Sequence, residues 1–180
     1  MREVYVCYLP ADSNLLKRSW LNKMAAWWVG QPGDGRSTPM IHCELFFPST
    51  QRVPASTDAV TGHACGIHFN GTVFMSPKQF SRKAWTFRAL NVSNKQYESM
   101  RAFCQTAADE KHSFNTAGYL CGVAKPQKQW YCSQLVGAAL NHAGVAELTE
   151  AQQSHPEHLY VALMPLTYLD TVRQLGSVEF

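Results

Sequence analysis

A cysteine at the predicted start of a helix is the residue of this chain best placed to do covalent chemistry. In the stretch QWYCSQLVGAALNHAGV, residues 129–145, Cys132 follows two aromatic residues and precedes an apolar, helically spaced segment. A thiol attacks a carbonyl only as thiolate, so a nucleophilic cysteine needs its pKa lowered by a helix N-terminus or a nearby imidazolium. A helix start carries about half a positive elementary charge, which would favour the thiolate of Cys132. The backbone N–H groups of Ser133 and Gln134 could then hold an oxyanion.

A nucleophilic cysteine also needs a base, and His42 in MIHCELFF is the candidate. Side chains alternate on a strand, so Met40, His42, Glu44 and Phe46 are predicted to share one face. His42 and Glu44 would lie roughly 6.5–7 Å apart along that face. A carboxylate there could orient the imidazole or stabilise its charged form, as the third member of a triad does. The residues therefore suggest a Cys132–His42–Glu44 triad.

Each of these residues also has a structural interpretation. Cys132 lies on the apolar stripe of its helix, and free cysteine is among the most buried residue types. His42 could simply pack at a sheet edge, and Glu44 could be an exposed strand carboxylate. Periodicity favours the structural interpretation of Cys132, and most histidines and glutamates in such positions do no chemistry, so none of the three is convincing singly.

Two segments of the chain resemble the NlpC-type papain-like cysteine peptidases. KHSFNTAGYLCG through the Cys132 helix is similar to the nucleophile half of that family, and IHCELFF is similar to its histidine-bearing strand. His42 precedes Cys132 by some ninety residues. This order resembles the circularly permuted branch, with its bacterial, viral and lecithin–retinol-acyltransferase-like members. The matching positions of the nucleophile half are Phe114, Gly118, Cys132, Ser133, Leu135, Val136 and Gly144.

The resemblance implies an α+β, circularly permuted papain-like fold, in which an antiparallel sheet packs against helices. It implies a cysteine hydrolase or acyltransferase that works through a thioester acyl-enzyme, with no cofactor and no metal. The expected substrate is a peptide, a peptidoglycan-like stem or a lipid ester. Many relatives have glycine in the place of Glu44 and a third polar residue on the next strand, which here would be His63 or His68. Glu44 is the preferred third residue, with His63 next.

Two other classes of function compete with this hypothesis. A non-catalytic binding module or virion-associated structural module could use the same fold, because fold alone does not imply activity. A zinc site could draw on imidazoles and thiols that lie close in sequence. The spacing disfavours zinc, since there is no paired C-x₂-C motif and Cys65 and His68 would point to opposite faces of a strand. The zinc candidates are His42, Cys43, His63, Cys65 and His68.

The strand that carries His42 must belong to a sheet in the first half of the chain. MIHCELFF lies between two prolines and is too short for a helix. HACGIHF and TVFM, joined by the Asn70-Gly71 turn signal, predict a hairpin, and AWTFRAL predicts another strand. Residues 48–62 are predicted to form a long loop within this region.

One helix is predicted before the sheet segment in the sequence and another after it. Residues 14–30 have apolar side chains at helical spacing and end in a glycine. Ser93 and Gln96 have the spacing of a capping box before a second apolar stripe.

The last third of the chain is predicted to be helical. The Cys132 helix should run from about Tyr131 to Ala143, with Gly144 as its C′ residue. Two short helices are expected to begin at Pro156 and Pro165. We therefore expect one α+β domain over residues 1–180, with the sheet at about 40–90 and the nucleophile helix at about 130–144.

Composition supports a folded protein and names no partner. The 180 residues are 46% hydrophobic and only 16% charged, unlike disordered chains. The net charge of +3 comes from scattered basic residues, so no nucleic-acid partner is expected. No signal peptide and no apolar run of about 20 residues is evident, which predicts a cytoplasmic protein without a transmembrane segment. The six cysteines are expected to be free thiols, and the oligomeric state stays open.

Overall fold

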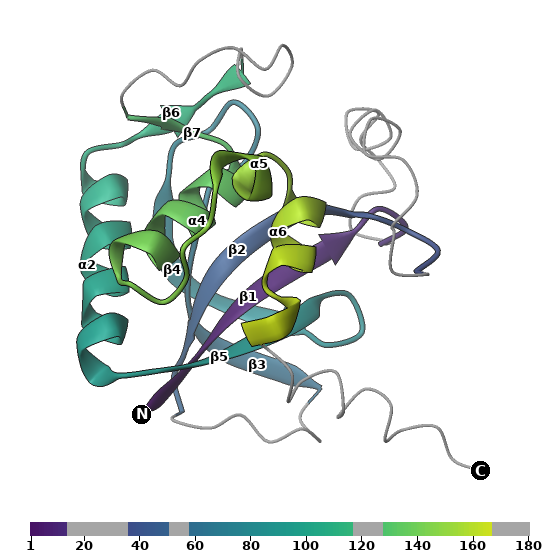
Figure 1. The fold of residues 1–180 in the computed structure, drawn as a ribbon, viewed down its shortest axis with the longest axis horizontal. Helices are drawn as coiled ribbons and strands as arrows, with labels where there is room; N and C mark the ends of the chain where they lie inside the picture. Colours follow the sequence, from purple (N-terminus) through teal and green to yellow (C-terminus); the bar gives the residue numbers. More distant parts are fainter. Residues whose placement is uncertain (14–35, 51–57, 117–127, 167–180) are drawn as a thin grey trace.

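The structure is a computed structural model that describes residues 1–13, 36–50, 58–116 and 128–166 (Figure 1). It has an α+β fold, as predicted, with a five-stranded antiparallel sheet and several helices. The predicted helix over residues 14–30 lies outside the described residues. The strands are β1 (Arg2–Pro10), β2 (Met40–Pro48), β3 (Ala59–Gly66), β4 (Phe74–Ser81), β5 (Thr86–Val92), β6 (Ser113–Phe114) and β7 (Gln129–Trp130). The helices are α2 (Asn94–Asp109), α4 (Cys132–His142), α5 (Glu150–Gln153), α6 (Pro156–Ala162) and the 3₁₀ turn η2 (Met164–Leu166).

The strand that carries His42 lies at the centre of the main sheet. The strand order is β4-β3-β2-β1-β5, and each neighbouring pair is antiparallel. Strand β2 therefore has partners on both sides, with Tyr8 opposite Cys43 and Leu45 opposite Cys65. The ladder with β1 includes His42 and Glu44, whereas the ladder with β3 runs from Leu45 to Pro48. The short strands β6 and β7 form a separate parallel pair.

Helices α2, α4 and α6 pack on one face of the main sheet (Figure 1). The core on this face joins Cys43, Leu45 and Phe47 of β2 to the apolar stripes of the helices. A second, smaller core lies on the opposite face and contains aromatic side chains from four strands. Its buried members are Tyr5, Cys7, Phe46, Val60, Ala64, Phe80 and Phe87.

A β-bulge interrupts the alternation at the start of β2. Leu9 pairs with His42, but Pro10 pairs with Met40, so the register shifts between them. Met40 consequently joins the helix-side core with Cys43, and the prediction that Met40 shares a face with His42 is wrong. A bulge adds one unpaired residue to a strand and turns the following side chains. The shift lies before His42, and the pairing of β2 with β1 is regular from His42 to Phe46.

The hairpin formed by β3 and β4 is longer than predicted. The Asn70-Gly71 turn signal is confirmed, since Gly71 N donates to His68 O at 2.9 Å and Asn70 has a positive φ of 57°. The turn is part of a connection between Gly66 and Phe74, however, and β3 already begins at Ala59. The predicted loop over 48–62 is therefore too long at both ends.

Gly62 explains this error, because glycine usually indicates a loop. In β3 it pairs with Pro48, and a Cβ at this position would lie 2.2 Å from Phe47 O. The absence of a side chain is what allows β3 to approach β2 so closely.

The helix signals are largely confirmed. Ser93 and Gln96 form a complete capping box at the start of α2. Helix α4 ends before Gly144, which has a φ of +63° as expected for a C′ residue. Pro156 is the first residue of α6, whereas Pro165 lies in the single turn η2. Helix α5, with its own capping box, was not predicted.

Two further expectations concern the chain as a whole. Among the described residues, no helix combines enough length and apolarity to cross a membrane. Five cysteines lie in the described part of the chain, and all five are buried free thiols; Cys121 lies outside it. They are Cys7, Cys43, Cys65, Cys104 and Cys132.

Candidate active site

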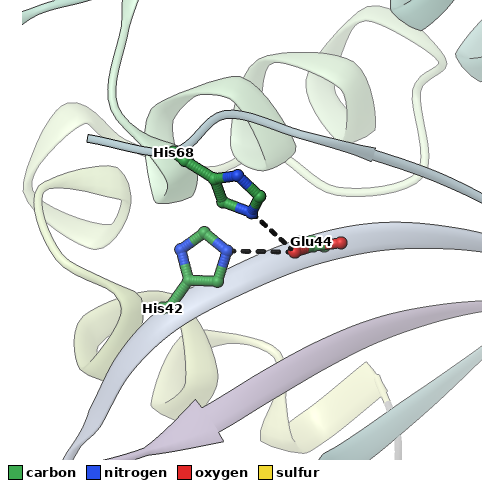
Figure 2. A group of neighbouring side chains, drawn as sticks. All are labelled: His42, Glu44 and His68. Atoms are coloured by element: carbon green, nitrogen blue, oxygen red, sulfur yellow. Dashed lines mark hydrogen bonds and ion pairs between the residues drawn. The ribbon is translucent and has the colours of Figure 1, made fainter. Parts of the chain in front are cut away.

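Strand β2 holds His42 and Glu44 in contact on one face of the sheet. His42 Nε2 lies 3.1 Å from Glu44 Oε1, and Figure 2 shows the two side chains pointing toward one another. The Glu44 side chain is fully buried, whereas that of His42 is 17% exposed. Because His42 and Glu44 are two positions apart on one strand, their side chains lie on the same face and form a direct imidazole–carboxylate hydrogen bond.

Cys132 meets His42 from the other side of the imidazole. It is the first residue of α4, and the side chain of the preceding N-cap residue Tyr131 makes no capping hydrogen bond. The Cys132 thiol is buried and hydrogen-bonds to the side chains of both His42 and Cys43. Because Nε2 of His42 faces Glu44, Nδ1 is the ring nitrogen left for the sulfur.

The contacts of Cys132 favour its thiolate. The hydrogen bond from the Cys43 thiol holds the pKa of Cys132 well below its ordinary value. Burial opposes this change, and the positive charge and hydrogen bond of His42 add to it. Burial also disfavours a charged His42, but the negative charge and hydrogen bond of Cys132, with those of Glu44, raise the pKa of His42 to about 10. These contacts therefore favour a thiolate–imidazolium pair.

Glu44 stays ionised although it is buried. Burial would raise its pKa, but hydrogen bonds from His42 and His68 and the charges of His42 and Lys78 hold the pKa well below its usual range. Lys78 Nζ lies 2.6 and 2.7 Å from the two carboxylate oxygens. His68 Nε2 lies 3.6 Å from Oε1 (Figure 2). These partners favour the charged form of the buried carboxylate.

The ammonium of Lys78 is itself surrounded by aromatic rings. Nζ lies 4.8 Å from the ring centre of Phe80, 5.2 Å from that of Trp85 and 5.6 Å from that of Phe74. These distances are in the range of cation–π interactions, which reinforces the position of Lys78 over Glu44.

Gly66 provides the space that Glu44 occupies. A Cβ at Gly66 would lie 2.8 Å from Glu44 Cγ and 2.9 Å from Phe74 Cζ. Both distances are shorter than van der Waals contact, so any larger residue would have to move Glu44 or Phe74.

The structure brings His68, and not His63, close to His42 and Glu44. His63 precedes Ala64, which belongs to the core on the Glu44 face, so alternation along β3 turns His63 to the helix side. His68 lies beyond the end of β3, and its ring centre is 5.5 Å from that of His42. Of the two alternatives to Glu44, only His68 is near the imidazole.

Ligand atoms of His42, Glu44 and His68 lie within 4.8 Å of one another. Two imidazoles and a carboxylate are a ligand set that zinc accepts. A cation there would have to displace the Lys78 ammonium, which contacts both carboxylate oxygens. The other zinc candidates contact different groups: Cys43 hydrogen-bonds to Cys132 and Cys65 to Cys104.

Two residues of the site were not assigned to it from the sequence. Cys43 is adjacent to His42 but on the opposite face of β2, in the helix-side core that also contains Cys132. Lys78 reaches Glu44 through the register of β3 against β4, where it pairs with Gly62. Hairpin register depends on the turn and was not predictable once the strand ends had been placed wrongly.

Removing the Cys43 hydrogen bond is expected to weaken the Cys132 thiolate. A thiol is a weak donor, and the loss of a typical hydrogen bond costs about 1 kcal/mol, so Cys43→Ala should slow alkylation of Cys132 at pH 6 by about three- to tenfold. Cys43→Ser keeps an O–H donor and should retain most of the rate. The measurement is the rate of iodoacetamide labelling of the Cys132 peptide by mass spectrometry. Equal rates in both variants and the wild type would show that Cys43 does not support the thiolate.

Comparison of the chain with protein-family models, curated proteins and solved structures found no match. The functional argument therefore depends on the contacts among Cys132, His42 and Glu44.

Proposed function

We propose that this protein is a cysteine hydrolase or acyltransferase with a Cys132–His42–Glu44 triad. In this proposal the chain has a circularly permuted papain-like fold, as its resemblance to NlpC-type peptidases implies. The observation that carries the proposal is the continuous contact from thiol to imidazole to buried carboxylate. Nucleophile, base and orienting group in such contact are the usual requirement for covalent catalysis at a carbonyl.

The proposed reaction forms and then breaks a thioester. The Cys132 thiolate attacks the carbonyl carbon of an amide or ester, and the carbonyl oxygen becomes negative. The His42 imidazolium gives its proton to the leaving amine or alcohol as the carbon–nitrogen or carbon–oxygen bond breaks. Neutral His42 then takes a proton from water, or from an acceptor amine or hydroxyl, which attacks the thioester. The acyl product leaves, and the thiolate–imidazolium pair is restored.

Glu44 has an orienting role in this proposal. Its hydrogen bond to His42 Nε2 keeps a proton on that nitrogen, so Nδ1 faces Cys132 throughout the cycle. The proposed substrates carry an acyl group on nitrogen or oxygen, as in a peptide, a peptidoglycan-like stem or a lipid ester.

Cys132 is expected to react with iodoacetamide near neutral pH. An ordinary thiol is about 1% thiolate at pH 6.5, so a lowered pKa gives up to about a hundredfold more thiolate. Lower nucleophilicity of a low-pKa thiolate offsets part of this gain, which leaves about tenfold. A thiolate is present above its pKa and is lost as the pH falls through it. The labelling rate of Cys132 should therefore be flat from pH 6.5 to 8, while that of a free small thiol such as glutathione rises with pH. A Cys132 rate that rises in parallel with that of glutathione would contradict the proposal.

Substrate profiling of the wild type and Cys132→Ala tests the activity itself. Turnover of an amide or ester by the wild type alone is expected, and it should fall as the pH rises through about 10, where His42 loses its proton. Reactive labelling of Cys132 without turnover of any substrate would favour the non-catalytic binding module.

A further inference from the structure

We propose that His155 donates a hydrogen bond from Nε2–H to the carbonyl oxygen of the substrate as that oxygen becomes negative. His155 is the N-cap residue of α6 and was not singled out by the sequence analysis. The inference rests on the proposed role of Cys132 as nucleophile and adds a catalytic residue to that site.

Two hydrogen bonds hold Gln153 and Glu157, the residues two positions before and after His155. Ser133, the neighbour of Cys132, donates from Oγ to Gln153 O at 2.8 Å. On the other side, Met40 N donates to Glu157 Oε2 at 2.8 Å, and Arg36 also binds Glu157. His155 is thus midway between a residue tied to the start of α4 and a residue tied to the His42 end of β2.

Close packing of α4 and α5 adds to the hydrogen bond between Ser133 and Gln153. A Cβ at Gly137 would lie 2.4 Å from Gln153 Cγ, so glycine is needed for Gln153 to lie against α4. The segment leading to His155 is therefore held against the helix that carries Cys132.

The capping bond fixes which ring nitrogen of His155 carries the proton. Nδ1 accepts a hydrogen bond from Glu157 N at 3.2 Å, so a neutral ring must carry its proton on Nε2. Burial lowers the pKa of His155 to about 4, and the negative charge of Cys132 opposes this change while the charge of His158 adds to it. His155 is therefore neutral at neutral pH, and it is close enough to Cys132 to respond to its charge.

The donor of His155 has no partner among the described residues. Nε2 is buried, and no hydrogen-bond acceptor for it exists in the described part of the chain. Buried polar groups in native structures are nearly always paired, so this N–H calls for an acceptor that the protein itself does not supply. The oxygen of a carbonyl attacked by Cys132 is an acceptor that would appear at this place.

A neutral imidazole is chemically suited to this role. It can stabilise a developing oxyanion by donating a hydrogen bond without losing its proton. The first-turn backbone N–H groups of α4, beginning at Cys132 and Ser133, would supply the other donors. His155 neither accepts nor transfers a proton in the reaction, so proton transfer remains with His42.

The rates of alkylation and of acylation of Cys132 together distinguish an oxyanion donor from other effects of His155. Iodoacetamide reacts by displacement at a saturated carbon and forms no oxyanion, whereas p-nitrophenyl acetate acylates the thiol through an oxyanion. The test variants are His155→Asn and His155→Ser, because both residues retain an N-cap acceptor for α6 and lack the Nε2–H. His158→Asn is the matched control, since His158 is an exposed histidine of the same helix.

We expect both His155 variants to lower the acylation rate by about tenfold or more, in line with the loss of one oxyanion donor, and to leave alkylation within about twofold. His158→Asn should change neither rate. Equal losses in both rates, or no loss in either, would overturn the role of His155 while leaving Cys132 as the nucleophile. A wild-type Cys132 that is not acylated at all would overturn the proposed function and this inference with it.

Discussion

Replacing His42 by alanine is expected to lower thiol-dependent turnover by about a thousandfold or more, with little loss of folding. The imidazole favours the Cys132 thiolate, and in the proposed reaction it also gives the proton to the leaving group. General acid–base catalysis contributes about 10²–10⁴-fold to the rate. When catalytic residues act as a unit, removing one of them costs nearly as much rate as removing all of them. The measurement is the hydrolysis of p-nitrophenyl acetate at pH 7 and of any natural-type substrate found by profiling.

Thermal unfolding distinguishes this result from a loss of structure. The side chain of His42 is partly exposed near the start of β2, so its removal should leave the melting temperature within a few degrees of the wild type. His63→Ala is the control, because His63 lies in the neighbouring strand on the opposite face of the sheet. If His42→Ala melts far lower yet retains activity, His42 is a core residue and the base lies elsewhere.

Local sequence patterns were sufficient to place the two ends of the candidate triad. The apolar stripe after Cys132 and the glycine at position 144 delimited α4, so Cys132 was expected at a helix start, where it lies. The alternation of MIHCELFF gave the contact between His42 and Glu44. Both predictions depend on residues fewer than fifteen positions apart, for which helix and strand periods are reliable guides.

The remaining contacts depend on how distant segments meet. The bulge at Met40, the approach of Lys78 to Glu44 and the position of His155 follow from register and packing across the chain. No local pattern encodes these. One local signal was overlooked: Thr149 and Gln152 have capping-box spacing, which would have predicted α5 and the course of the chain just before His155.

Lys78 changes what is expected of Glu44. The carboxylate is shared between the imidazole and an ammonium, so part of its negative charge is compensated before it acts on His42. Removing the carboxylate charge leaves Lys78 unpaired in a buried site beside an imidazolium. The lost negative charge and the uncompensated ammonium of Lys78 both disfavour a charged His42.

Glu44→Gln is therefore expected to lower turnover by about ten- to a thousandfold, below the roughly 10⁴-fold loss when the buried aspartate of serine proteases is replaced. The upper limb of the pH profile should also move down from about 10, because the carboxylate helps to raise the pKa of His42 and that pKa falls when the charge is lost. Turnover and its pH dependence on p-nitrophenyl acetate measure both effects.

Adding Lys78→Met to Glu44→Gln tests whether the unpaired ammonium of Lys78 causes part of the loss of turnover. Lys78→Met removes the ammonium and keeps an apolar side chain among the aromatic rings. In the Glu44→Gln background it should restore part of the lost activity, because no unpaired positive charge then remains near His42. His63→Ala should have little effect, since that side chain faces the other side of the sheet. A Glu44→Gln variant near wild type, with His68→Ala strongly impaired, would make His68 the third residue, and equal small effects would leave a Cys132–His42 dyad in which Glu44 serves to anchor Lys78.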